Sequence, residues 1–297
     1  DAVFTNPPGR NIIFYFRASV IDMPDNVNGL IWISDDDSST ITVAGIVDPV
    51  TGAILENPIG LPKTENGVSE RTTGHICFTG KSSPILGNVY FYDNEFTLLA
   101  TDTTTLSSAG QLNPPVAVSD NFFYAAQYVS GSSAIRVRRW DFDGVLDATF
   151  VTVDLPLPSG WDRISNFGVT PDDTIMYYDW FRPAVPTADV VKRWDLVNDV
   201  ALTDFYTAGN KERLKDIYVN TASHIFLGIS NIPDNLYKVL RFNAAGTILN
   251  TYTIDPDDGF LDHICPGIND QVSFWVWQHL EDPADSSRFI YTMIEIL

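Results

Sequence analysis

Arg139-Trp140-Asp141-Phe142-Asp143-Gly144 is the stretch that decides the fold, because variants of it recur along the chain. Each variant is an apolar segment followed by an acid or amide and then by a turn. The variants are anchored at Asp48, Asp93, Asp141, Asp195 and Asn243, which gives steps of 45, 48, 54 and 48 residues. Repeats of about this length are typical of β-propeller blades. The sequence therefore predicts a repeat fold of the propeller type.

Within each repeat the pattern predicts four short antiparallel strands. In the clearest repeat they cover residues 164–170, 174–180, 190–194 and 201–207, all rich in β-branched and aromatic side chains. Pro171 and Gly144 lie where tight turns between such strands require them. No segment carries a sustained apolar period of 3.6 residues. The chain is therefore expected to be all-β, with very little helix.

The length of 297 residues holds about six repeats. We therefore predict one β-propeller domain over residues 1–297, with about six four-stranded blades. Seven blades, or five blades and an extension, are the alternatives. The last repeat, from Leu261, has room for only three strands. A segment within residues 1–20, either 2–6 or 11–20, is expected to supply the fourth strand and close the ring.

Composition narrows the classes of function. Acidic residues outnumber basic ones 38 to 18, and a net charge of −20 would repel nucleic acid and anionic membranes. No apolar run approaches the roughly 18 residues of a membrane span, so no membrane insertion is expected. Two cysteines do not make a disulfide framework. Sequence signatures of serine hydrolases, zinc proteases and nucleotide-binding enzymes are absent from the sequence.

Two segments resemble a known family of six-bladed propellers. Residues 166–178 and 215–219 are similar to the paired strands that carry metal ligands in the calcium-dependent lactonase and senescence-marker group. This resemblance implies that Asn166 and Asp216 bind a divalent metal, with Ca²⁺ as the expected ion, at the mouth of the central channel. Such an ion would polarise a lactone carbonyl and activate water. The glutamate that the family places near its N-terminus has no counterpart here.

A second candidate metal site comes from a repeated tripeptide. His75-Ile76-Cys77 and His263-Ile264-Cys265 are identical, and we expect both to lie in the first strands of their repeats. Residues two apart share one face of a strand, so His75 and His263 are candidate zinc ligands with their cysteines. Burial of small apolar side chains is the alternative interpretation, and the one that we prefer.

The preferred function is a non-enzymatic interaction or structural propeller without a cofactor. The loose Arg-Trp-Asp repeats resemble NHL-like blades and propeller domains of tailed-bacteriophage virion proteins, which implies a virion or extracellular location. Expected partners are proteins, including other virion subunits, or a host surface glycan. The insertion that contains Phe181, Arg182, Pro183 and Val185 is the expected contact loop. A lactonase-like hydrolase and a secreted carbohydrate-binding propeller with an aromatic platform are the alternatives.

Overall fold

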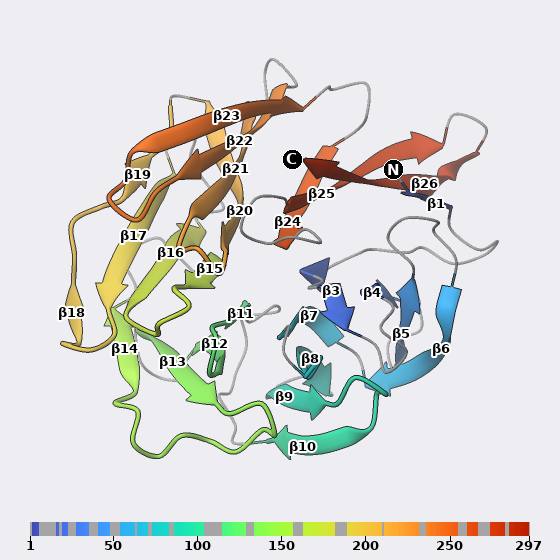
Figure 1. Ribbon diagram of the computed structural model, residues 1–297, viewed down its shortest axis with the longest axis horizontal. Helices are drawn as coiled ribbons and strands as arrows, with labels where there is room; N and C mark the ends of the chain where they lie inside the picture. The colour runs from blue at the N-terminus through green and yellow to red at the C-terminus, as the bar shows by residue number, and fades with distance from the viewer. Residues whose placement is uncertain are drawn as a thin grey trace.

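Six β-sheets are arranged around a ring in the computed structural model (Figure 1). The structure describes residues 2–5, 16–17, 20–22, 28–35, 41–47, 54–62, 64–70, 73–82, 86–103, 115–128, 134–156, 163–181, 189–209, 211–231, 236–254, 260–266, 274–282 and 285–296. Every regular element among these residues is a β-strand. The predicted all-β, propeller-like fold is confirmed.

The sheets are numbered here as blades 1–6 in chain order. Blade 1 contains β3 (Val20–Asp22), β4 (Asn28–Asp35), β5 (Ile41–Val47) and β6 (Ile54–Pro62). Blade 2 contains β7 (Thr64–Ser69), β8 (Ile76–Ser82), β9 (Leu86–Tyr92) and β10 (Leu98–Asp102). Blade 3 contains β11 (Val116–Val118), β12 (Phe123–Tyr128), β13 (Ala134–Trp140) and β14 (Val153–Pro156).

The second half of the ring repeats this order. Blade 4 contains β15 (Arg163–Val169), β16 (Ile175–Phe181), β17 (Val190–Asp195), β18 (Val200–Ala201) and β19 (Tyr206–Thr207). Blade 5 contains β20 (Glu212–Val219), β21 (Ile225–Asn231), β22 (Leu236–Phe242) and β23 (Ile248–Ile254). Blade 6 contains β24 (Phe260–Pro266), β25 (Phe274–Asp282), β26 (Asp285–Ile296) and β1 (Ala2–Thr5). The first strand of each blade lies nearest the centre of the ring (Figure 1).

Two short N-terminal strands occupy different places in the ring. β1 pairs antiparallel with β26, with Val3 opposite Thr292, so the two ends of the described chain meet in blade 6 (Figure 1). β2 (Phe16–Arg17) instead pairs in parallel with β7, with Phe16 opposite Gly67. It also lies next to β24 and β4, which places it inside the ring.

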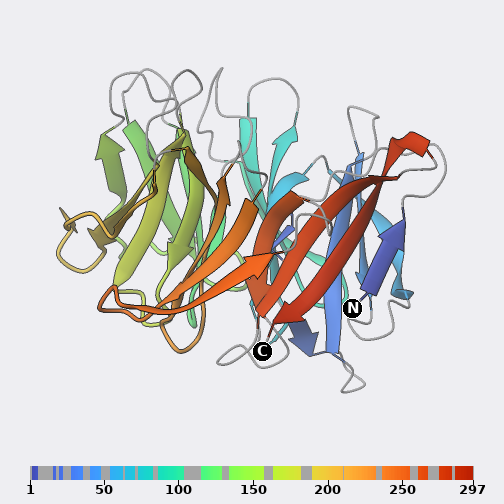
Figure 2. The ribbon, with the colours of Figure 1, turned by 90° about the horizontal axis from the view of Figure 1, so that it is seen from above.

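The repeated acid or amide caps the turn between the third and fourth strands. Asp141 Oδ1 accepts a hydrogen bond from the N–H of Val145 at 2.8 Å, and Asn243 Oδ1 accepts one from Thr247 at 2.9 Å. Gly144 has a φ of 83°, a conformation that glycine adopts without a steric penalty. The acid or amide that marks the repeats in the sequence is therefore needed to cap this turn. The turn lies at one face of the ring (Figure 2).

The core lies between neighbouring blades. Phe91 of blade 2 packs against Phe123 and Trp140 of blade 3, with ring centroids 6.0 and 5.7 Å apart. All three side chains are at most 1% exposed. Blades 3 and 4 meet in a similar way, because Tyr124 and Phe167 belong to one buried cluster. Packing of large aromatic side chains thus fixes each blade against the next one.

Candidate functional site

Three of the innermost strands have the same polar contact beside an irregularity in their β-pairing. The pairing register shifts within β15, β20 and β24, and a backbone N–H beside each shift donates to an aspartate carboxylate. Each of these carboxylates belongs to a residue that is at most 9% exposed. The bonds run from Asn166 to Asp179 Oδ1, from Leu214 to Asp189 Oδ2 and from Ile264 to Asp216 Oδ2, at 2.6, 2.8 and 2.8 Å.

Asp216 is the most buried member of this set and joins two blades. It lies on β20 of blade 5 and has no solvent exposure. Its Oδ2 accepts the N–H of Ile264 on β24 of blade 6, and its Oδ1 accepts the N–H of Ile217 at 2.8 Å. Backbone donors therefore compensate for much of the cost of burying this carboxylate. The geometry assigns Asp216 a structural role, and its proposed metal-binding role stays a prediction.

The two candidate histidines do not occupy equivalent positions. His263 lies on β24, the first strand of blade 6, with its Nδ1 3.6 Å from Asp216 Oδ2. His75 precedes β8, the second strand of blade 2, and its Nδ1 lies 3.9 Å from Asp143 Oδ1. The expectation that both tripeptides lie in the first strands of their blades was wrong, because an identical tripeptide can occupy different strands in different blades. Cys77 is fully buried.

The structure brings together two of the four predicted metal ligands, Asp216 and His263. Asn166 lies on the neighbouring inner strand β15 and is 6% exposed. Across the described residues, no group of three or more His, Cys, Asp or Glu side chains is placed to hold a metal ion. Of the predicted contact loop, Phe181 ends β16, whereas Arg182, Pro183 and Val185 lie outside the described residues.

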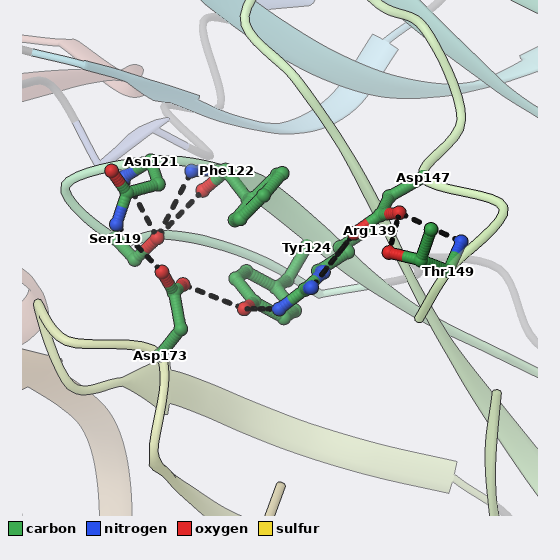
Figure 3. A network of polar contacts seen from close by, with 8 residues as sticks. All are labelled: Ser119, Asn121, Phe122, Tyr124, Arg139, Asp147, Thr149 and Asp173. Atoms are coloured by element: carbon green, nitrogen blue, oxygen red, sulfur yellow. Dashed lines mark hydrogen bonds and ion pairs between the residues drawn. The ribbon is translucent and has the colours of Figure 1, made fainter. Parts of the chain in front are cut away.

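A polar network joins blades 3 and 4 (Figure 3). Asp173, in the turn between β15 and β16, accepts hydrogen bonds from Asn121 Nδ2 at 2.8 Å and from the Tyr124 hydroxyl at 2.6 Å. Arg139 donates from Nη1 to the Tyr124 hydroxyl at 3.4 Å and from Nε to Asp147 Oδ2 at 2.8 Å. The two blades are thus tied together by side chains as well as by packing.

The electrostatics of this network suit a structural role. Burial raises the pKa of Tyr124, and its hydrogen bond to Asp173 raises it further. Hydrogen bonds from Thr149, and then from Arg139, lower the pKa of Asp147 to about 2. Near neutral pH the tyrosine is therefore a neutral donor and Asp147 a charged acceptor. Because Tyr124 is fully buried and already bonded, it is not placed to act as a base.

Exposed apolar side chains recur at the outside of blades 2–5. In three of these blades an adjacent pair follows the turn between the third and fourth strands, and its members are 40–63% exposed. Related side chains extend the pattern along blades 3 and 4. We call this set the outer apolar wall: Leu98, Leu99, Val145, Leu146, Val151, Val197, Val200, Ile248 and Leu249.

Three aromatic side chains of blade 4 are buried and do not form part of an exposed platform. Tyr177, Tyr178 and Trp180 are 1%, 5% and 6% exposed, respectively. Tyr177 belongs to the core cluster shared with blade 5, and Tyr178 and Trp180 belong to the one shared with blade 3. These three residues therefore serve packing and leave no ring face for a sugar.

Sequence reasoning missed the carboxylates of Asp179 and Asp189. Asp179 could have been noticed, since it is the one charged residue in the strand Ile175–Phe181. A charge inside an apolar strand indicates a buried polar partner. Asp189 carried no such signal, because its partner Leu214 lies 25 residues away in the next blade.

Comparisons with known proteins identify no family for this chain. No family model matches the chain, and no curated protein matches it. Among solved structures, hydrazine synthase of Kuenenia stuttgartiensis aligns with a TM-score of 0.46 and 12% identity. The alignment covers 71% of this chain and 54% of that one, so this chain spans about half of the matched protein. Where the structure describes the chain, no helix has the length and hydrophobicity needed to cross a membrane.

Proposed function

We propose that the protein is a non-enzymatic β-propeller that acts by contact with other proteins. The observation that carries this proposal is the outer apolar wall, whose exposed side chains recur in four successive blades. Single exposed apolar residues are ordinary. Here an adjacent exposed pair recurs after the same turn in three blades, and this regularity supports a role in contacts. A virion-associated or extracellular setting is part of the proposal. Its support is the resemblance of the loose Arg-Trp-Asp repeats to propeller domains of tailed-bacteriophage virion proteins.

The arrangement of the inner strands also favours contact over catalysis. Both carboxylate oxygens of Asp216 accept backbone hydrogen bonds, which reduces their capacity to bind a cation. The strand Phe16–Arg17 pairs with the inner edge of blade 2, inside the ring. A substrate in the central channel would therefore have to share that space with the chain itself.

The lactonase alternative supplies the sharpest test. Purified protein is incubated with a panel of lactones, once with calcium and once with EDTA. We expect no hydrolysis above the protein-free rate in either condition. Calcium-dependent hydrolysis that disappears in Asn166→Ala, but persists in the exposed-turn control Asn198→Ala, would overturn the proposal and establish the enzyme.

The outer apolar wall has its own test. Replacing Val145 and Val197, which are 63% and 69% exposed, by serine should shorten retention on a hydrophobic-interaction column. Replacing the fully buried Val137 by serine is not a suitable control, because it would damage the core. Thr101→Ser, on the outer strand β10, is the matched control and should leave retention unchanged. Equal retention of the Val145 and Val197 variants would refute an adhesive wall.

A further inference from the structure

The outer edge of blade 5 lacks the features that usually protect an edge strand. β23 reads Ile248-Leu249-Asn250-Thr251-Tyr252-Thr253-Ile254 and contains no charge, proline or glycine. Natural edge strands are commonly interrupted by charge or proline, or kept short, because an open edge recruits other strands. The other outer strands of blades 1–4 follow that rule through Glu56 and Pro58 in β6, Asp102 in β10, Asp154 and Pro156 in β14, and the shortness of β18.

β23 is accessible along most of its length. Ile248 and Leu249 are 49% and 44% exposed, and Asn250, Thr251 and Thr253 are exposed as well. Among the described strands, β23 pairs only with β22, and it lies at the periphery of the ring (Figure 1). Its outer edge therefore presents backbone donors and acceptors to a further strand.

Charge distinguishes this blade from the rest of the chain. Residues 236–254 contain Lys238 and Arg241 but no acidic residue. Residues 211–254 hold five basic and three acidic residues, although the whole chain carries a net charge of −20. Two copies of so acidic a protein repel each other over most of their surface. Blade 5 is where they can approach with little local repulsion.

We propose that two copies of the chain associate by antiparallel pairing of β23 with β23 of the second copy, centred on Thr251. A two-fold axis makes such an interface self-complementary. In this register Leu249 lies opposite Thr253 of the second copy, and Asn250 lies opposite Tyr252. Asn250 Nδ2 already donates to the Tyr252 hydroxyl of its own strand at 2.8 Å, so these side chains share a face. The axis brings two such polar pairs together.

The pairing of two seven-residue strands is a small interface. Stable complexes generally bury roughly 1,200–2,000 Å², and a single strand pair covers less than this. We therefore expect a dissociation constant of about 1–100 µM, which corresponds to about −5.5 to −8 kcal/mol. Higher salt should strengthen the dimer, because it screens the repulsion between the two acidic chains.

Charge exchange at the axis tests the register. Thr251→Lys and Thr251→Glu each place like charges opposite one another in the dimer, which disfavours cross-strand pairing. Sedimentation velocity should show a concentration-dependent dimer for the wild type and monomers for both variants. An equimolar mixture of the two variants should form the dimer again. Thr101→Lys, an exposed threonine on the outer strand β10, should behave as the wild type does.

The inference rests on the proposed function, since a dimer contact is one contact of an interaction protein. The two can nevertheless be refuted by different results. A wild-type protein that stays monomeric up to about 100 µM, or a dimer that survives both Thr251 variants, would overturn it. Unmixed variants that dimerise as well as their mixture would also overturn it. None of these results would alter the lactone assay. Circular dichroism melts of each variant establish that loss of the dimer is not loss of the fold.

Discussion

Replacing Asp216 should destabilise the fold whether or not metal is present. Each oxygen of this fully buried carboxylate accepts a backbone N–H at 2.8 Å. A hydrogen bond to a charged group contributes about 1.5–3 kcal/mol, and a buried donor left unpaired adds a comparable penalty. Asp216→Asn keeps one acceptor and should lower the free energy of unfolding by about 2–3 kcal/mol. Asp216→Ala loses both acceptors and should lower it by about 3–6 kcal/mol.

Losses of this size are large beside the total stability of about 5–15 kcal/mol that is usual for a protein. Urea titration followed by tryptophan fluorescence measures them as a shift of the midpoint at constant slope. Asp195→Asn is the control, because Asp195 caps an exposed turn and should matter little. An unchanged midpoint for Asp216→Ala in EDTA would refute the structural role. Calcium stabilisation of the wild type that vanishes in Asp216→Asn would show that a metal is held there instead.

Three further predictions concern single positions. Asp147, with its pKa lowered to about 2 from 3.8, contributes stability that is present above pH 3.8 and lost as the pH falls towards 2, so Asp147→Asn should flatten acid unfolding curves. Gly144→Ala should cost more than Gly246→Ala in thermal melts, since both φ values are positive but only the Gly144 Cβ would come within 2.5 Å of a neighbour. Cys77, whose pKa is raised by burial, should resist thiol reagents in Cys265→Ala until urea is added.

These three predictions can each fail clearly. Unchanged acid unfolding in Asp147→Asn, or equal melting temperatures for the two glycine variants, would contradict the contacts described. Rapid labelling of Cys77 in the native protein would contradict its burial.

Local turn chemistry made the blades visible in the sequence. The strand predicted at residues 174–180 differs from β16 by one residue at each end, and the strand predicted at residues 190–194 ends one residue before β17 does. Asn243 signals the end of its strand because its side chain bonds the turn that follows, within four residues. Such short-range interactions can be recognised from residues that are close together in the sequence. The fold was therefore predictable from the repeats.

Strand pairing at the outer edge of a blade and contacts between blades were not predictable from local sequence. The segment 201–207, expected to be one strand, is divided into β18 and β19, which both pair with β17. The donors that bind Asp189 and Asp216 lie 25 and 48 residues away along the chain. Asp216 was singled out from a resemblance, whereas its contacts depend on how blade 5 meets blade 6. No local pattern reports that geometry.

Metal content measured after exhaustive dialysis tests the central claim most directly. A tightly bound ion must stabilise the folded state by mass action, so elemental analysis is combined with melting in calcium and in EDTA. A propeller that acts by contact alone should retain substoichiometric metal and melt at the same temperature in both solutions. One retained calcium or zinc ion per chain, with a higher melting temperature when it is bound, would contradict the account and redirect attention to Asp216 and His263.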